Sequence, residues 1–227
     1  MKLKLNHLIR PMFILTLFIS ACGSPAVDNA PVEKKEVKIE NKKEAKTILF
    51  FGNSLTAGFG LSLEESFPLL IQKKVDSLNL SYKCVNAGVS GETTTTGLNR
   101  LPWVLKQKVD VFVLELGAND GLRGIPVATS KKNLIAMILK VQETYPKAKV
   151  VLCGMQVPPN MGETYANDFK AIYPEIAAAH PSIRFIPFLL DGVAGDPILN
   201  QADGIHPTVE GARIVSETIW TFLKEVL

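Results

Sequence analysis

The sequence has few of the residues that act as general bases and metal ligands, with three histidines among 227 residues. His7 lies in an N-terminal segment that we expect to be removed, and His180 stands between an alanine run and a proline. The remaining histidine, His206, follows Asp203 by three positions, and a neighbouring carboxylate is what orients a catalytic imidazole. This scarcity leaves His206 as the one well-placed candidate for a catalytic base.

Cysteine is equally scarce, with three in the chain. Cys84 and Cys153 both fall in apolar, strand-like runs, which favours buried free thiols over a disulfide. Neither has a nearby histidine or the spacing of a metal ligand, which argues against a zinc site. We therefore expect chemistry that needs no metal and no cofactor.

The main part of the chain also lacks an excess of charge. The formal net charge is +3, and the basic residues Lys2, Lys4 and Arg10 account for all of it. Without this leader the chain is neutral, so its charge gives no reason to infer a nucleic acid or an anionic surface as a partner.

No apolar run near the N-terminus is long enough to span a membrane. The run at 11–19 follows basic residues and precedes small ones, which indicates a secretory signal peptide over residues 1–21. The ending at Cys22 resembles a lipobox, in which the cysteine is lipidated and becomes the first residue of the mature protein. The alternative is an ordinary signal peptide with an incidental cysteine.

Residues 22–46 have the composition of a mobile tether, with turn formers followed by a mixed-charge run and little to bury. Residues 47–227 then suffice for one domain with a sizeable core. If Cys22 is lipidated, the sequence predicts a protein of the bacterial cell envelope, anchored to a membrane by acyl chains and facing the periplasm or the exterior. We expect it to be a monomer.

The domain alternates between strand and helix patterns. Apolar or β-branched runs predict strands at 47–51, 82–86, 109–116, 150–155 and 183–186. Amphipathic patterns predict helices from Ser66, over 127–145, over 163–179, and from Pro207 as the first helical residue of a final helix. Strands joined by crossover helices form parallel sheets, so we expect a three-layer α/β/α sandwich with a five-stranded parallel sheet.

The candidate site residues each follow a predicted strand. Ser54 follows the first strand, Gly88 the second and Asn119 the third, while Asp203 and His206 follow the fifth. In open parallel sheets the ligand crevice lies beyond the carboxyl ends of the strands. The pattern therefore predicts that these residues meet at one edge of the sheet.

Four segments of the domain resemble the four sequence blocks of the SGNH, or GDSL-type, serine hydrolases. They are the segments at 52–58, 86–91, 117–124 and 203–207. The similarity spans 47–227 and is strongest to the branch of bacterial thioesterase I, lysophospholipase and arylesterase. The resemblance implies a flavodoxin-like fold and hydrolysis of an ester bond.

The resemblance also implies a role for each site residue. Ser54 would be the nucleophile, His206 the general base and later acid, and Asp203 the group that orients the imidazole. The backbone N–H groups of Ser54 and Gly88, with the side-chain amide of Asn119, would form the oxyanion hole.

Taken singly, these residues have structural explanations. Asn119 could form a turn, Gly88 could be a turn glycine, and Ser54 could cap a helix. The four blocks in order, each at a strand end, favour the catalytic interpretation. One departure is Asn53, where the family normally has aspartate; because Asp203 supplies the carboxylate of the triad, we expect activity to survive.

We expect a serine esterase that cleaves carboxylic esters or thioesters of a small molecule or lipid through an acyl-serine intermediate. Two alternatives stay open: a carbohydrate O-acetyl esterase, and a non-catalytic lipoprotein that binds a glycan or lipid on the same fold. Four residues in loops near the site could form an apolar wall for the acyl group or could serve only in packing: Leu122, Ile125, Pro159 and Met161.

Overall fold

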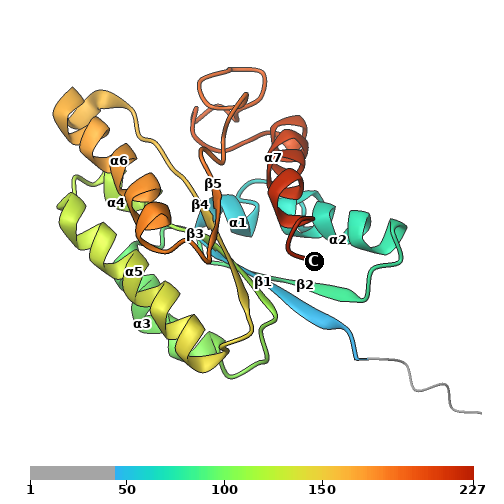
Figure 1. Ribbon diagram of the computed structural model, residues 1–227. Helices are drawn as coiled ribbons and strands as arrows, with labels where there is room; N and C mark the ends of the chain where they lie inside the picture. The colour runs from blue at the N-terminus through green and yellow to red at the C-terminus, as the bar shows by residue number, and fades with distance from the viewer. Residues whose placement is uncertain (1–43) are drawn as a thin grey trace, which may run out of the picture. The chain divides into compact units, whose positions relative to one another are not determined.

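The computed structural model describes residues 44–227 (Figure 1). The predicted signal peptide, Cys22 and most of the tether lie outside the described residues. Within 44–227, no helix is both long and apolar enough to cross a membrane.

Five parallel strands form a single sheet, as predicted. They are β1 (Lys46–Gly52), β2 (Tyr82–Gly88), β3 (Val111–Glu115), β4 (Lys149–Cys153) and β5 (Arg184–Ile186), in the order β2-β1-β3-β4-β5. All residues of β3 are buried, because helices cover both faces of the sheet. In the register of the sheet, Gly52 at the end of β1 pairs with Gly88 on one side and Glu115 on the other.

Helices form the two outer layers of the sandwich (Figure 1). They are α1 (Ser54–Ala57), α2 (Phe67–Ser77), α3 (Thr94–Val104), α4 (Ala118–Leu122), α5 (Val127–Thr144), α6 (Glu163–Ala179) and α7 (Val209–Leu223). Helix α5 packs between α3 and α6 on one face of the sheet, and α2 packs against α7 on the other. The three-layer α/β/α architecture is thus confirmed.

Helix α3 was not predicted, because its sequence is a poor helix former. It starts with three threonines, continues with a glycine and contains Pro102. Capping and tertiary contacts compensate: the Thr93 hydroxyl accepts a hydrogen bond from the Thr96 N–H at 3.3 Å, and the Thr94 N–H donates to the buried Asp120 carboxylate at 2.8 Å. Tertiary contacts override the local preference.

The start of the last helix also differs from the prediction. Helix α7 begins at Val209, and the Thr208 side chain caps it by accepting a hydrogen bond from the Gly211 N–H at 3.3 Å. Pro207 is not helical; it forms an isolated antiparallel bridge with Asn200. This bridge ties the segment just after His206 to Asn200 before the helix begins.

Two leucines associated with the amphipathic helices α2 and α5 are exposed. Leu78 at the end of α2 is 57% exposed and Leu139 in α5 is 49% exposed. The neighbour of the latter, Ile138, is fully buried and packs in the hydrophobic core. Two adjacent residues of α5 therefore differ in burial: the Ile138 side chain lies in the core, and the Leu139 side chain is exposed to solvent.

Replacing Ile138 by alanine is expected to lower the free energy of unfolding by about 2–5 kcal/mol, because it leaves a cavity in the core. Leu139→Ala, the matched surface control, should cost less than about 1 kcal/mol. Urea denaturation followed by circular dichroism measures both. Equal losses would contradict the packing described for α5.

Candidate active site

The turn after β1 presents Ser54 at the base of a cavity. Asn53 caps the short helix α1, with its side-chain oxygen accepting a hydrogen bond from the Leu55 N–H at 2.9 Å. Ser54 is the first residue of this helix and is 9% exposed. Gly52 allows α1 to lie close to the end of β1, since a Cβ at position 52 would lie 2.1 Å from the Thr56 hydroxyl oxygen.

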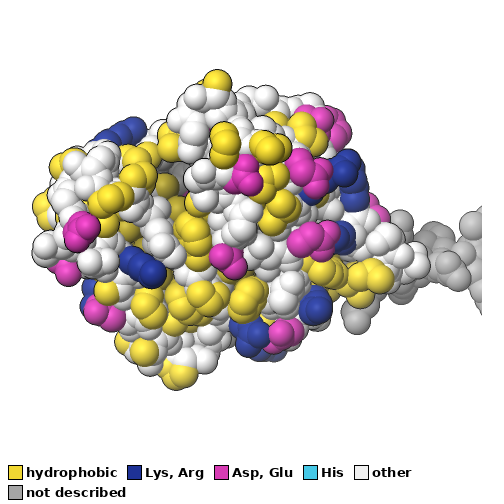
Figure 2. Space-filling view, turned by 90° about the horizontal axis from the view of Figure 1, so that it is seen from above, with side chains coloured by type: hydrophobic (Ala, Val, Ile, Leu, Met, Phe, Trp, Pro, Cys, Tyr) yellow, Lys and Arg dark blue, Asp and Glu magenta, His cyan; other side chains and the backbone are white. Residues whose placement is uncertain are grey.

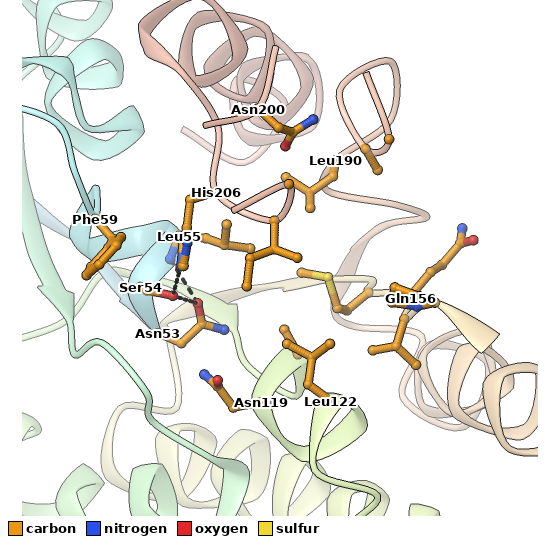
Figure 3. A pocket seen from close by; sticks show the side chains of 18 of the residues that line it. Asn53, Ser54, Leu55, Phe59, Asn119, Leu122, Gln156, Leu190, Asn200 and His206 are labelled. Carbon is orange, nitrogen blue, oxygen red and sulfur yellow. Dashed lines mark hydrogen bonds between the residues drawn. The ribbon is translucent and has the colours of Figure 1, made fainter. Parts of the chain in front are cut away.

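The segment before α7 brings an imidazole to this serine. His206 Nε2 lies 2.8 Å from Ser54 Oγ (Figure 3). On the other side of the ring, His206 Nδ1 lies 2.7 Å from Asp203 Oδ2. The other carboxylate oxygen of Asp203 accepts hydrogen bonds from the N–H groups of Ile205 and His206, both at 3.0 Å. The structure thus brings the three residues predicted as a triad into one hydrogen-bonded chain.

The charge state of Asp203 fixes the roles of the two ring nitrogens. The hydrogen bond from His206, together with the one from the Ile205 N–H, lowers the pKa of Asp203 to about 2. An ionised carboxylate only accepts hydrogen bonds, so Nδ1 carries the proton and Nε2 of a neutral ring is free to accept one from Ser54. This is the tautomer that activates a serine hydroxyl.

Gln201 joins the two segments that carry the serine and the histidine. Its amide nitrogen donates to the carbonyl of Phe59 at 2.7 Å and to that of Pro207 at 2.9 Å. The Phe59 ring lies against the imidazole of His206, with centroids 4.6 Å apart. The two contacts made by Phe59 were not predicted, since they join residues that are distant in the sequence.

The prediction that Gly88 contributes to an oxyanion hole is wrong. Strand β2 runs through Gly88, whose N–H donates to the side-chain oxygen of Asn86 at 3.0 Å. A Cβ at Gly88 would lie 2.2 Å from the backbone nitrogen of Ala57, so this glycine is packed beneath α1. It does not line the cavity.

Gly91, three residues later in the same sequence block, takes the place in the oxyanion hole that was predicted for Gly88. It lines the cavity together with Ser54 and Asn119, and its φ of 78° is one that glycine adopts without strain. Within residues 44–227, no backbone or side-chain group accepts a hydrogen bond from its N–H. The sequence did contain a signal, namely a second glycine in this block. Which of the two glycines faces the cavity depends on where the strand β2 ends.

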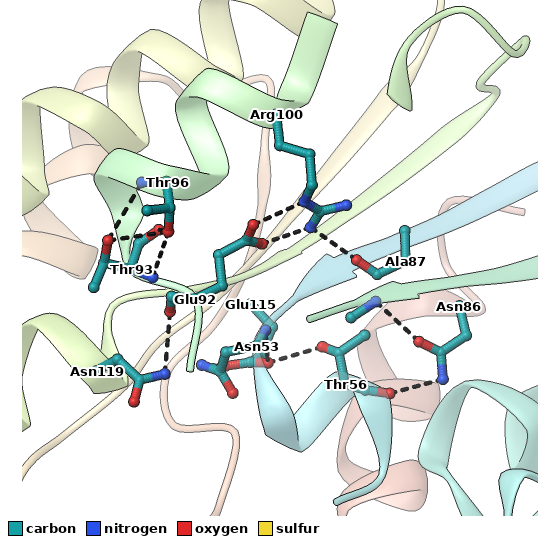
Figure 4. A network of polar contacts seen from close by, with 11 residues as sticks. Asn53, Thr56, Asn86, Ala87, Glu92, Thr93, Thr96, Arg100, Glu115 and Asn119 are labelled. Atoms are coloured by element: carbon teal, nitrogen blue, oxygen red, sulfur yellow. Dashed lines mark hydrogen bonds and ion pairs between the residues drawn. The ribbon is translucent and has the colours of Figure 1, made fainter. Parts of the chain in front are cut away.

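Asn119, as predicted, reaches the cavity from α4. One of its amide hydrogens is donated to the carbonyl of Glu92 at 3.1 Å, which leaves the other available to a ligand (Figure 4). The Glu92 carboxylate is buried and paired with Arg100, whose Nε donates to it at 2.7 Å. This ion pair fixes the carbonyl that orients Asn119.

The cavity in front of Ser54 has a volume of about 350 Å³. Viewed from above, hydrophobic side chains gather in the middle of this face (Figure 2). Of the four predicted wall residues Leu122 lines the cavity, whereas Ile125, Pro159 and Met161 do not. The apolar wall comes mainly from residues after β4 and β5, which were not predicted: Met155, Val157, Pro158, Phe188 and Leu190.

A metal site or a thiol nucleophile would have to be built from the histidines, cysteines and acidic residues of the described part of the chain. Within 44–227, no three His, Cys, Asp or Glu side chains are grouped so as to hold a metal ion. Cys84 and Cys153 are buried free thiols, as predicted; burial raises the pKa of Cys84 to about 12 and also raises the pKa of Cys153 well above its ordinary value. Neither thiol is a nucleophile near neutral pH.

Comparison with known proteins places this geometry in a family. The profile of the GDSL-like lipase/acylhydrolase family matches residues 50–214, and the chain belongs to that family. The predicted family is therefore confirmed, and with it the assignment as an enzyme that hydrolyses ester bonds.

Individual relatives are similar over most of the domain. Esterase TesA of Pseudomonas aeruginosa is 38% identical over 192 residues, covering 84% of this chain and 94% of that protein. Thioesterase 1/protease 1/lysophospholipase L1 of Escherichia coli K12 is 36% identical over 174 residues, 76% of this chain and 81% of that protein. A crystal structure of TesA superposes with a TM-score of 0.76 at 39% identity, covering 80% of this chain and 100% of the other.

Replacing Asn119 by alanine is expected to lower kcat about 10²–10³-fold, because it removes one donor aimed at the developing oxyanion. The matched control is Asn133→Ala, which deletes a buried amide that donates to Thr94 and Thr95 instead. The control should lower the melting temperature but leave kcat within a few-fold. Steady-state kinetics that showed equal losses for the two variants would contradict the role of Asn119.

Proposed function

We propose that this protein is a serine esterase in which Ser54 attacks the carbonyl carbon of an acyl ester and His206 takes the serine proton. The observation that carries the proposal is the continuous chain from Ser54 Oγ through the imidazole to Asp203, with contacts of 2.8 and 2.7 Å. A serine hydroxyl is a weak nucleophile until a neutral imidazole can accept its proton.

The geometry supports both halves of the reaction. As the tetrahedral intermediate forms, the ionised Asp203 stabilises the imidazolium, and the N–H groups of Ser54 and Gly91 with the Asn119 amide face the negative oxygen. His206 then donates its proton to the leaving alcohol or thiol, which breaks the ester bond and leaves an acyl-serine. Water, deprotonated by the same imidazole, releases the acid and restores Ser54.

The cavity supports an acyl group of several carbons as the part of the substrate that is recognised. Its walls are mostly apolar, and about 350 Å³ is far more than an acetyl group fills. This favours carboxylic esters or thioesters of longer acids over acetylated sugars. The named relatives include an esterase and a thioesterase/lysophospholipase, which agrees with a site that accepts more than one leaving group.

We also propose that Cys22 is lipidated and anchors the enzyme to a membrane of the bacterial cell envelope. The support for this is the sequence alone: a basic start, the apolar run at 11–19 and the small residues before Cys22. The tether at 22–46 would hold the catalytic domain away from the lipid surface.

Replacing Ser54 by alanine is expected to lower hydrolysis of a p-nitrophenyl ester by about 10⁴-fold or more, because no acyl-serine can form. Ser90→Ala is the matched control, since Ser90 also lines the cavity, whereas the hydroxyl hydrogen-bonded to His206 is that of Ser54. The control should keep most of its activity, with both variants folded by circular dichroism. Activity retained in Ser54→Ala would disprove the proposed nucleophile.

Filling the cavity should change the preferred acyl length. Val157→Phe is expected to lower kcat/KM for octanoyl and longer p-nitrophenyl esters about 10-fold and to spare the acetyl ester, because about two buried methylenes lose their place. Met161→Phe, outside the cavity lining, is the control. An equal loss for all acyl lengths, or an effect of the control alone, would place the acyl group elsewhere.

A further inference from the structure

A buried carboxylate that the reaction does not use lies directly behind the nucleophile. Glu115, the last residue of β3, is 1% exposed and is absent from the cavity lining. It faces Asn53 and Thr56 in the turn between β1 and α1 (Figure 4). Gly52 leaves room for it, since a Cβ there would lie 2.5 Å from Glu115 Oε2. Burial of an acidic side chain is costly unless its oxygens are satisfied.

Within residues 44–227, every hydrogen bond to the Glu115 carboxylate comes from the turn that carries Ser54. Oε1 accepts from the Asn53 side-chain amide at 2.7 Å. Oε2 accepts from the Asn53 backbone N–H at 3.1 Å and from the Thr56 hydroxyl at 2.8 Å. The donors lie immediately before Ser54 and two residues after it, so the carboxylate grips the turn on both sides of the nucleophile.

The donors suit an ionised carboxylate and not a protonated one. The two Asn53 N–H groups can only donate, so the O–H of a carboxylic acid could be accepted only by the Thr56 hydroxyl, whose own bond to Oε2 would then be lost. The Asn53 amide has no freedom to reverse, because its oxygen accepts from the Leu55 N–H at 2.9 Å and caps α1. The amide nitrogen must therefore face Glu115.

We propose that Glu115 is a positioning residue of this esterase, which as a carboxylate holds the Asn53–Thr56 turn so that the Ser54 hydroxyl faces His206. The pair of side chains at positions 53 and 115 then needs one negatively charged carboxylate and one hydrogen-bond donor that faces it. Asparagine at position 53 supplies the donor. An aspartate there would bring two carboxyl groups together, and the pair would have to share a proton. The inference rests on the proposed role of Ser54.

The surroundings of Glu115 make its charge sensitive to pH. Burial raises its pKa from the ordinary 4.5 to about 7, although the hydrogen bonds from Thr56 and Asn53 oppose the rise. The titratable groups that face it are Cys153 on β4 and Tyr173 on α6, and burial raises the pKa of each so that both are neutral near pH 7. Glu115 is therefore the group behind the turn that titrates near neutrality.

The sign of the effect differs between activity and stability. Below about pH 7 Glu115 takes up a proton, the hydrogen bond that the Thr56 hydroxyl donates to it is lost, and kcat should fall. Stability moves the other way: a carboxyl group whose pKa is raised by folding stabilises the native state most at low pH, and this contribution is lost as pH rises from 4.5 to about 7. A purely structural carboxylate would not oppose activity to stability in this way.

Glu115→Gln tests the requirement for charge. The variant is expected to lower kcat at pH 8 about 10-fold with KM unchanged, because the introduced amide places a donor against the donors of the turn and misaligns Ser54. Its acid limb of kcat should lose one ionisation between pH 6 and 8. Its melting temperature at pH 8 should equal or exceed that of the wild type, since a buried charge is removed.

The double variant Asn53→Asp with Glu115→Gln is the matched test. It moves the negative charge across the pair: the introduced glutamine donates to the introduced aspartate, and its oxygen accepts from the backbone N–H and the Thr56 hydroxyl. All the hydrogen bonds are kept, so kcat should return to within about threefold of the wild type, a difference of less than 1 kcal/mol.

Unchanged kcat and pH profile in Glu115→Gln would overturn the inference. So would a lowered melting temperature with no recovery in the double variant, because that pattern describes a structural residue only. Failure of the proposed function would be distinguishable, since it is seen in Ser54→Ala retaining the turnover of the wild type whatever the residue at position 115.

Discussion

One hydrogen bond joins the two halves of the active site: Ser54 Oγ and His206 Nε2 lie 2.8 Å apart although 152 positions separate them in the chain. The parallel sheet makes this contact possible, because the segments after its strands all emerge at one edge. Two side chains then fix the distance between Ser54 and His206 through their hydrogen bonds. Gln201 joins the carbonyls of Phe59 and Pro207, and Glu115 holds the turn under Ser54. A displacement of Gln201 or of Glu115 would therefore change the distance between Ser54 Oγ and His206 Nε2.

Much of the fold could be predicted because its strongest signals are local. The inner strands β1, β3 and β4 are buried and give continuous apolar runs, whereas the edge strands β2 and β5 were found from shorter runs with some polar residues. Helix α3 was missed for the opposite reason, since its threonines and Pro102 are poor helix formers. What stabilises it is the Thr94 contact with Asp120, and a contact with a residue so far along the chain leaves no local pattern.

The triad could also be predicted, whereas the oxyanion glycine could not. Two glycines stand three positions apart in one block, and the choice between them depends on the length of β2. The strand continues to Gly88, which pairs with Gly52, so the backbone turns toward the cavity only afterwards and presents Gly91. The prediction of the cavity walls was mostly wrong for a similar reason, because the path of the loops after β4 and β5 decides which side chains face Ser54.

The most direct test of the Ser54–His206 contact is to trap the protein with a fluorophosphonate and locate the adduct by peptide mass spectrometry. The account predicts one phosphonate on Ser54, formed quickly in the wild type and far more slowly in His206→Ala, because the hydroxyl must lose its proton to the imidazole. An adduct on Ser90, or labelling of Ser54 that does not depend on His206, would contradict it.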